Sequence, residues 1–308
     1  MPRLSLIVCR YDATHFARLR DNLEATLTTA PELVVVDNRD NRHDLFSAYN
    51  EGLGRATGEL LCFLHEDLTF PEAGWDARAV AHFDADAGLG MIGVAGGRSL
   101  HVLPRSWKHT YHPGDYAQAL TEPDGSDGVY GLGPDGRRQV LLLDGLWMCV
   151  RRRVVEAHGL RFDEGHFRGF HRYDYDFSLQ VARYARVAVV GDVRPLHHSY
   201  GRRDKAWLRA SADFQRKWND VLPCTLVEGG AGIRTLPWTR NDYLAVVRFA
   251  LNMRKLGCGR REIDGLLDVV LGARSRKPYE LRLAECYARS RGVALGPRAA
   301  GAPQPAGS

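Results

Sequence analysis

About the first hundred residues alternate between two patterns of hydrophobic positions. Largely apolar runs of strand length occupy residues 4–9, 33–36, 60–64 and 91–95. Between these runs, apolar residues recur at helical spacing: Phe16, Leu19, Leu23 and Leu27, then Leu45, Ala48, Tyr49 and Leu53, then Trp75, Ala79, Val80 and Phe83. Alternation of this kind predicts an α/β fold whose sheet is mixed but mostly parallel and is flanked by helices.

The pattern changes at about residue 101. Residues 101–136 are rich in Gly, Pro, His, Tyr and Asp, which is typical of a long loop, and Asp135-Gly136 is expected to turn a hairpin between residues 129–130 and 139–143. Strands are then predicted at 146–150 and 187–190, and helices at about 153–157 and 175–184. Beyond residue 224 the pattern is helical, over 241–256, 261–271 and 278–290.

Length and composition limit the possible organisation of the chain. Its 308 residues, 44% hydrophobic and 26% charged, suit one large domain with a small appendage. We expect a main domain over 1–224, with halves of about 1–100 and 101–224, then a helical extension over 225–295. The Gly-, Ala- and Pro-rich residues 296–308 are expected to be a disordered tail.

Several protein classes are disfavoured. No apolar run approaches the ~20 residues of a membrane-spanning helix, and the N-terminus lacks a signal-peptide pattern, so a cytoplasmic location is expected. The six cysteines form no C-x-x-C pair, which argues against a zinc ribbon or a redox motif. The net charge of +5 is scattered, which suits an anionic small ligand or a peripheral membrane contact and argues against nucleic-acid binding.

Polar residues follow the predicted strands, where open α/β sheets bind ligands. The first strand leads into Arg10-Tyr11, the second into Asp37-Asn38 and the third into His65-Glu66-Asp67. Neither a G-x-G-x-x-G motif nor a Gly-rich loop ending in Lys follows the first strand, which excludes the corresponding nucleotide-binding motifs. Tyr11 suits stacking on a base and Asp37 suits a ribose hydroxyl. Adjacent Glu66 and Asp67 suit Mg²⁺ or Mn²⁺, or else a helix cap with a surface acid.

A second polar cluster lies between residues 162 and 198. Asp174 is a candidate proton acceptor, whereas a structural role is favoured for Asp176. His197 follows a late strand and can complete a metal site begun on the third strand, with His198 as the neighbouring alternative.

In these motifs the chain resembles the GT-A fold glycosyltransferases of family 2, over about residues 4–218. The similar segments are Asp37-Asn38, residues 48–52 and 56–67, residues 144–152, Phe162-Asp163-Glu164, residues 174–180 and Leu196-His197-His198. Within that family the chain is most similar to the branch of streptomycin-biosynthesis-like glycosyltransferases.

The resemblance implies a metal-dependent, inverting transfer of a sugar from a nucleotide-sugar donor, expected to be a UDP- or dTDP-sugar, to a hydroxyl acceptor. That acceptor is a saccharide, a natural product or a peptide. Asp67 and His197 would hold a divalent metal, Mn²⁺ or Mg²⁺, and Asp174 would be the catalytic base. The implied nucleotide-sugar contacts are Arg10, Tyr11, Asp37, Asn38, Asn50 and Glu66. The implied acceptor contacts are Asp144, Gly145 and Trp147.

Two residues depart from the family pattern. His65 stands where the first Asp of the metal-binding triplet is usual, and Tyr173 stands where an acid usually precedes the base. They leave open a second hypothesis, a catalytically impaired nucleotide-sugar-binding or scaffolding protein with the same fold. A metal-dependent hydrolase is disfavoured because no H-E-x-x-H spacing occurs.

Three further features concern the acceptor and the surroundings of the site. Aromatic residues of the middle segment, among them Trp107, Tyr116 and Tyr130, suit either a sugar platform or core packing. Arg202, Arg203 and Lys205 suit either a basic lid or a solvated surface. The helix at 241–256 suits either a membrane or partner surface or, as favoured, packing on the main domain.

Overall fold

The computed structural model describes residues 2–112, 114–122, 124–133, 135–199 and 203–272. Within these residues the main sheet has seven strands, in the order β10-β13-β5-β12-β3-β1-β2. Their bounds are β1 (Leu4–Arg10), β2 (Glu32–Asp37), β3 (Leu60–Leu64), β5 (Leu89–Gly93), β10 (Arg137–Val140), β12 (Trp147–Arg151) and β13 (Arg186–Val190). β1 pairs in parallel with β2 and β3, and β13 with β5, whereas β12 and β10 run in the opposite direction.

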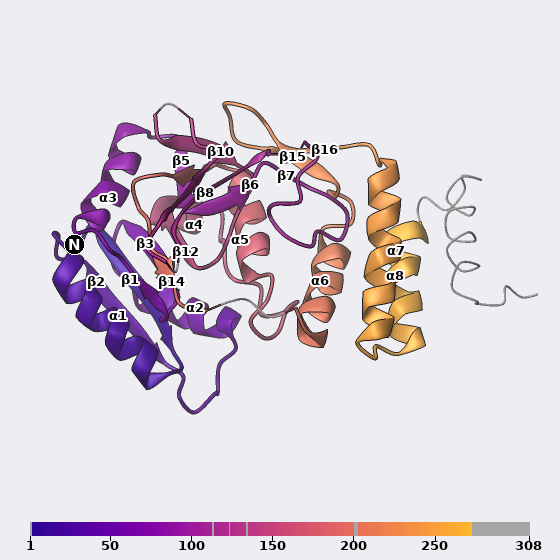
Figure 1. The fold of residues 1–308 in the computed structure, drawn as a ribbon, viewed down its shortest axis with the longest axis horizontal. Coiled ribbons are helices and arrows are strands. Elements are labelled where there is room, and N and C mark those ends of the chain that lie inside the picture. Colours follow the sequence, from indigo (N-terminus) through magenta and orange to yellow (C-terminus); the bar gives the residue numbers. More distant parts are fainter. Residues whose placement is uncertain (1, 113, 123, 134, 200–202, 273–308) are drawn as a thin grey trace, which may run out of the picture.

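Successive side chains of these strands point to opposite faces of the sheet, and each face is covered by helices. Ile7 and Phe63 pack with α2 (Leu45–Arg55) and α5 (Tyr173–Ala182). Leu6 and Cys62 pack with α1 (Ala13–Thr26) and α3 (Trp75–Ala85) on the other face. α4 (Arg152–Ala157) follows β12 directly. The strands and helices predicted for the first hundred residues are therefore present, in an α/β arrangement (Figure 1).

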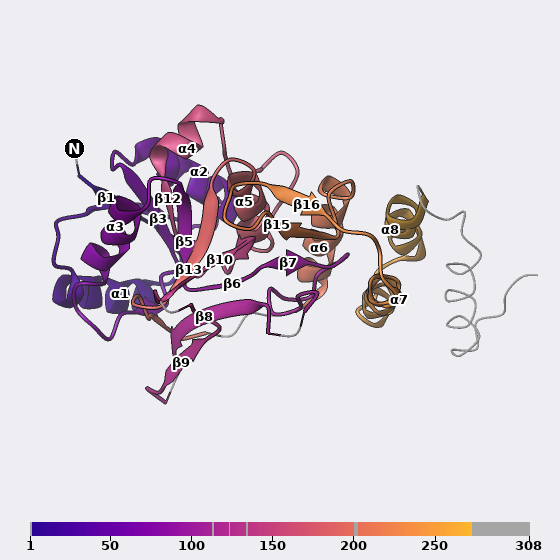
Figure 2. The ribbon, with the colours of Figure 1, turned by 90° about the horizontal axis from the view of Figure 1, so that it is seen from above.

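Two smaller sheets complete the fold. One orders its strands β11-β6-β8-β14-β4, with β9 paired to β8, and Figure 2 shows β8 and β9 projecting from the main body. Its strands are β4 (Leu68–Thr69), β6 (Ala95–Gly97), β8 (Tyr116–Thr121), β9 (Asp127–Tyr130), β11 (Leu142–Leu143) and β14 (Leu196–His197). The other consists of β7 (Ser99–Leu100), β15 (Cys224–Leu226) and β16 (Ile233–Thr235).

The hairpin predicted between residues 129–130 and 139–143 is wrong. β9 pairs with the preceding β8, whereas β10 joins the main sheet beside β13. Pairing of β10 with the distant β13 is favoured over the local hairpin because it buries Val140 in the main core, whereas β9 is largely exposed. β15 and β16 also lie in a segment that was expected to be helical.

The C-terminal helices pack on the rest of the chain. α6 (Lys205–Lys217), α7 (Arg240–Lys255) and α8 (Arg260–Gly272) lie next to one another at the side away from α1 (Figure 1). Val246 and Phe249 of α7 are buried with Leu208 of α6, as the packing interpretation expected. None of the helices in the described part of the chain has the length and apolar character needed to cross a bilayer. The predicted helix at 278–290 and the tail at 296–308 lie outside the described residues.

Two glycines of α2 test how closely this helix packs on β1. A Cβ at Gly52 would lie 2.3 Å from Ile7 Cγ2, whereas Gly54 has nothing within 4 Å. We expect Gly52→Ala to lower the free energy of unfolding by ~1–3 kcal/mol through overpacking. Gly54→Ala is expected to raise it by up to ~1 kcal/mol through helix propensity. Urea unfolding of both variants measures the difference, and equal effects would contradict the packing described.

Candidate active site

The strand ends place the first group of predicted site residues at one edge of the main sheet. Arg10 at the end of β1 is in register with Asp37 at the end of β2. Both carboxylate oxygens of Glu66, just after β3, accept hydrogen bonds from the backbone, at 2.9 Å from Tyr11 N and 2.8 Å from Asp12 N. Glu66 therefore ties the end of β3 to the end of β1 and holds Tyr11, whose ring is exposed, beside Arg10 and Asp37.

Charge at this edge is partly compensated. Hydrogen bonds from the Arg39 guanidinium lower the pKa of Asp37 to about 2, so its carboxylate is ionised. The guanidinium of Arg10 lies 5.1 Å from the centre of the Phe16 ring. Its Nε is buried and, among the described residues, has no hydrogen-bond partner. A buried donor without a partner is costly, and a bound anion would satisfy it.

The reversed direction of β12 brings a second segment to the same edge. Trp147, the first residue of β12, pairs with Leu64, the last residue of β3. The residues before Trp147 therefore lie beside the residues after Leu64, and His65 N donates to Leu146 O at 3.0 Å. This pairing places Asp144 and Gly145 next to the His65-Glu66-Asp67 segment.

His65, Asp67 and His197 form the candidate metal centre, with one potential ligand atom from each within 4.8 Å of the others. His197 reaches it because β14 pairs with β4, with His197 opposite Leu68. Its Nε2 lies 3.3 Å from Asp67 Oδ2, and His65 Nδ1 lies 3.9 Å from Asp67 Oδ1. Two imidazoles and a carboxylate are a donor set that suits divalent transition metals.

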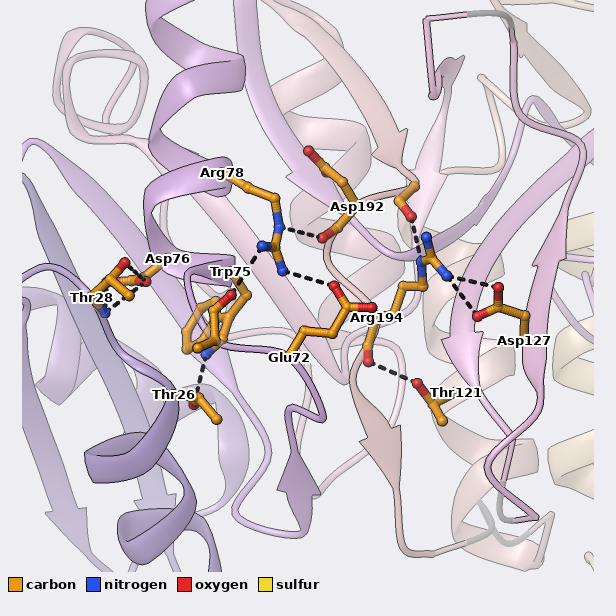
Figure 3. Close-up of polar contacts among 12 residues, drawn as sticks. Thr26, Thr28, Glu72, Trp75, Asp76, Arg78, Thr121, Asp127, Asp192 and Arg194 are labelled. Carbon is orange, nitrogen blue, oxygen red and sulfur yellow. Dashed lines mark hydrogen bonds and ion pairs between the residues drawn. The ribbon is translucent and has the colours of Figure 1, made fainter.

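The connection that leads into β14 is held from both sides (Figure 3). From α3, Arg78 Nε donates to Asp192 O at 2.7 Å. From β8, Thr121 Oγ1 donates to Arg194 O at 3.0 Å. The Arg194 guanidinium contacts both carboxylate oxygens of Asp127, at 2.7 and 2.8 Å. These contacts fix the approach to His197, so the imidazole is positioned by the fold.

The cluster keeps Asp67 ionised. Burial opposes ionisation, but hydrogen bonds from His197 and Ser199 and the neighbouring imidazoles outweigh it, and the pKa of Asp67 falls below its usual value. Burial would also lower the pKa of His197, yet its contact with Asp67 raises it. His65 differs, because burial and the adjacent His197 lower its pKa. A neutral His65 beside an ionised Asp67 is the protonation state that metal binding requires.

Tyr173 fixes the orientation of His65. Its hydroxyl lies 2.6 Å from His65 Nε2, which leaves Nδ1 directed toward Asp67. Gly145 makes room for this contact, because a Cβ there would lie 2.2 Å from the Tyr173 hydroxyl oxygen. A partner on the outer nitrogen of a ligating histidine sets its tautomer and ring orientation. The residues that depart from the family pattern, His65 and Tyr173, thus contact each other.

Asp174 lies in the first turn of α5 and is partly accessible. Its carboxylate accepts hydrogen bonds from Gly145 N at 3.2 Å and from Tyr175 N at 2.9 Å. Burial, followed by repulsion from Asp144, raises its pKa to about 7. Asp144 itself accepts from Trp107 Nε1 at 2.8 Å and from Leu146 N at 3.2 Å, so each of its oxygens has a donor.

Arg172, two residues before Asp174, is a buried cation. Arg172 precedes α5 with a φ of 71°, a left-handed conformation that is rare for a non-glycine residue. Its guanidinium donates to Ser211 Oγ and Pro104 O and lies 4.8 Å from the centre of the Trp207 ring. Its positive charge partly offsets the rise in the pKa of Asp174.

Other predicted contacts are internal. Asn38 exchanges hydrogen bonds with the backbone of His43, and Asn50 does so with that of Phe162, and both amides are buried. Trp147 is fully buried beside Trp75, so in this structure it is a core residue and not a surface for an acceptor. The strand pattern could not separate these roles, because residues at a strand end serve packing and binding alike.

The remaining alternatives are also placed. Asp176 is buried against Lys217 and Trp218, which agrees with the structural interpretation. His198 bonds Thr69 and lies outside the metal cluster. Lys205 begins α6 and donates to Gly257 O, whereas Arg202 of the predicted basic lid lies outside the described residues.

Sequence reasoning did not assign His65 to the metal site and treated it only as a departure. Its position directly after β3, two residues before Asp67, was the available signal, because side chains that follow the same strand end lie close together. The role of Tyr173 had no local signal, since its contact with His65 spans 108 positions in the chain.

Comparison with known proteins identifies the family. Residues 5–217 match the profile of a family described as "Glycosyltransferase like family". The chain belongs to this family. The streptomycin biosynthesis protein StrF of Streptomyces griseus is 28% identical over 258 residues, which cover 79% of this chain and 85% of that protein.

Solved structures of glycosyltransferases are similar to this family member. GalNAc-T7, determined with UDP, GalNAc and Mn²⁺, has a TM-score of 0.50 at 14% identity over 97% of this chain and 59% of that chain. Mannosyltransferase PcManGT of Pyrobaculum calidifontis, determined with GDP-Man and Mn²⁺, has a TM-score of 0.48 at 16% identity over 94% and 81%. The predicted GT-A fold and glycosyltransferase class are thereby confirmed.

The raised pKa of Asp174 makes a prediction about the stability of this glycosyltransferase. Because the folded-state pKa of about 7 exceeds the ordinary value of 3.8, the wild type loses stability as pH rises between these values. We expect Asp174→Asn to melt a few degrees higher than the wild type at pH 8, since ~1 kcal/mol corresponds to ~2–4 °C in domains of 150–250 residues.

Thermal unfolding in EDTA across pH 4–8 checks this expectation. The advantage of the variant is expected to shrink to nothing toward acid pH, where Asp174 is neutral in the folded protein. A variant that is less stable than the wild type at pH 8 would contradict the electrostatics described.

Proposed function

We propose that the protein transfers a sugar from a nucleotide-sugar donor to a hydroxyl acceptor, with inversion at the anomeric carbon and a divalent metal held by His65, Asp67 and His197. One observation carries the proposal. The candidate metal centre and Asp174 are joined by direct contacts, because the hydroxyl of Tyr173, the neighbour of Asp174, lies 2.6 Å from His65 Nε2. The segment before β12 contacts both, since Gly145 N donates to Asp174 at 3.2 Å and Leu146 O accepts from His65 N at 3.0 Å. An ionised metal-binding carboxylate and a carboxyl of near-neutral pKa therefore share one site.

The donor fits the edge formed by β1, β2 and β3. The exposed ring of Tyr11 suits stacking on a base, and the ionised Asp37 suits hydrogen bonds from ribose hydroxyls or a base N–H. The buried, unpartnered Nε of Arg10 suits an anionic group of the same ligand. We propose a UDP- or dTDP-sugar, with its diphosphate directed toward Asp67.

The metal centre fits an ion that accepts nitrogen ligands. Mg²⁺ binds almost entirely through oxygen, and affinity for a site with nitrogen ligands rises along the first-row divalent transition metals from Mn²⁺ onward. GalNAc-T7, which has a similar fold, was determined with Mn²⁺, so we propose Mn²⁺ as the preferred cofactor. Bound there, a divalent ion would neutralise charge on the departing nucleoside diphosphate. Asp67 supplies the anionic ligand, and Tyr173 holds His65 with Nδ1 free for the ion.

Asp174 is the proposed base. A pKa of about 7 leaves its carboxylate substantially ionised near neutral pH while it remains basic enough to accept the proton of the attacking hydroxyl. A retaining double displacement needs a second carboxylate as nucleophile. Asp144 is the neighbouring acid, and both its oxygens already accept hydrogen bonds from Trp107 and Leu146, which supports inversion.

His197, the last residue of β14, and His198, which follows it, provide a matched test of the metal centre. We expect His197→Ala and Asp67→Ala to weaken Mn²⁺-dependent binding of UDP or dTDP by at least the ~10–100-fold typical of losing an outer-shell partner. His198→Ala, outside the cluster, is expected to leave binding unchanged. Calorimetric titration of the nucleotide with Mn²⁺ and then Mg²⁺ measures both effects. Equal affinity in the His197 variant and the wild type would rule out this metal centre.

Asp174→Asn separates catalysis from binding. We expect it to slow the Mn²⁺-dependent release of nucleoside diphosphate from a UDP- or dTDP-sugar by ~10²–10⁴-fold, with nucleotide affinity retained. The wild-type rate is expected to rise with pH and level off above about 7, because the base must be deprotonated. Release measured from pH 5 to 9 tests this. A wild type that binds the donor without releasing product would favour the non-catalytic binding protein.

A further inference from the structure

A cavity of about 390 Å³ lies apart from the candidate active site, between residues 101–110 and helix α7. None of the residues of the metal cluster lines it. The polar and charged residues of its wall are His101, Arg105, Lys108, His109, Thr110, Asn241 and Arg248.

The charge of this cavity is positive and largely uncompensated. Arg105, Lys108 and Arg248 are exposed at its wall, and within the described part of the chain none of the three forms an ion pair with a carboxylate. His109 also lines the cavity, and burial together with the positive charge of Arg105 lowers its pKa.

None of the described residues that line the cavity is an acid, and the acid that contacts its wall, through His101, has other partners. Asp242 of α7 is fully buried and is already bonded to His101, Tyr111 and Thr239. Some surface arginines elsewhere are paired, as Arg194 is with Asp127 and Arg209 with Glu262, whereas Arg254 forms no ion pair within the described residues. The cavity differs because three cations without a carboxylate partner line one concave wall, which indicates a binding site for an anion.

The wall of the cavity is also connected to the two acids on the acceptor side of the active site. Trp107, between Arg105 and Lys108 in the chain, donates to Asp144 at 2.8 Å, and the Lys108 ammonium lies 5.0 Å from the centre of its ring. The backbone oxygen of Pro104, a lining residue, accepts from Arg172, which acts electrostatically on Asp174.

Arg203 shares an aromatic neighbour with Arg172, because their guanidinium groups lie 5.9 and 4.8 Å from the centre of the Trp207 ring. The donor residues Arg10, Tyr11 and Asp37 take no part in the cavity. Its position therefore points to the acceptor and not to the nucleotide.

We propose that this cationic cavity binds a phosphate group carried by the acceptor and so directs the acceptor hydroxyl toward Asp174. The inference rests on the proposed function, since it names the class of acceptor. The planar guanidinium groups of Arg105 and Arg248 suit bidentate contacts with phosphate oxygens. The phosphate is carried either by a soluble ester or by a lipid headgroup, and both present the same anion to the same residues.

Binding of phenyl phosphate in EDTA tests the cavity without loading the metal centre. We expect wild-type protein to bind the probe, and the double variant Arg105→Gln/Arg248→Gln to bind it at least ~10-fold more weakly, because charge-assisted hydrogen bonds are lost. Arg254→Gln is the matched control, since Arg254 is exposed on the same helix but does not line the cavity. It is expected to bind like the wild type.

Vesicles distinguish the two sources of phosphate. The proteins are floated with phosphatidylcholine vesicles that contain phosphatidic acid. Flotation of the wild type and of Arg254→Gln, but not of the double variant, would support a lipid-borne phosphate. Binding of phenyl phosphate alone would support a soluble ester. Equal binding of both probes by the wild type and the double variant, or no binding of either, would overturn the inference.

The result is separable from the proposed function. Mn²⁺-dependent UDP or dTDP binding by the double variant is expected to match the wild type, which also shows that the variant is folded. If the double variant binds the nucleotide normally and also binds phosphate as well as the wild type does, only the inference about the cavity is contradicted, and the proposed function stands. Failure of the wild type to bind either nucleotide removes the proposed function and leaves the phosphate result interpretable.

Discussion

Repulsion between Asp144 and Asp174, close to the carboxylate of Asp67, is the constraint around which the site is built. The charges of Asp67 and Asp174 both act to raise the pKa of Tyr173, and the charge of Asp144 acts to raise the pKa of His65 and His197. Like charges this close cannot all remain ionised without compensation. The structure divides them: contacts with the imidazoles keep Asp67 ionised, and the raised pKa of Asp174 lets that carboxyl retain its proton more readily.

This division depends on strand direction as much as on side-chain chemistry. β12 enters the sheet against the direction of β3, so the segment before its first residue meets the segment after the last residue of β3. A parallel strand at this position would put the same segment at the opposite edge of the sheet. β14 then supplies His197 from a different sheet. The site therefore lies where the ends of several strands come together, and each acid belongs to a separate element.

The sequence allowed the strand ends to be predicted because buried strands and amphipathic helices leave a local periodic signal. Asp37, Glu66 and Asp67 follow such strands directly, and the structure places them at one edge. What could not be predicted depends on partners distant in the chain. β10 pairs with β13 and not with β9, and β15 pairs with β7, although neither choice alters the local pattern. Whether Asn50 or Trp147 is internal likewise depends on which distant elements cover it.

The two departures from the family pattern are best understood as one change. An acid at position 65 together with an acid at position 173 would add two negative charges beside Asp67, Asp144 and Asp174. Here a histidine and a tyrosine take those positions, and they satisfy each other at 2.6 Å. Either replacement alone would leave an imidazole or a phenol facing a carboxylate, with a different orientation for the imidazole of residue 65. Because the pair is neutral, the site has less anionic charge than the family pattern gives and has a nitrogen donor in place of an oxygen donor. In the proposed metal centre, that exchange favours a cation that binds imidazole.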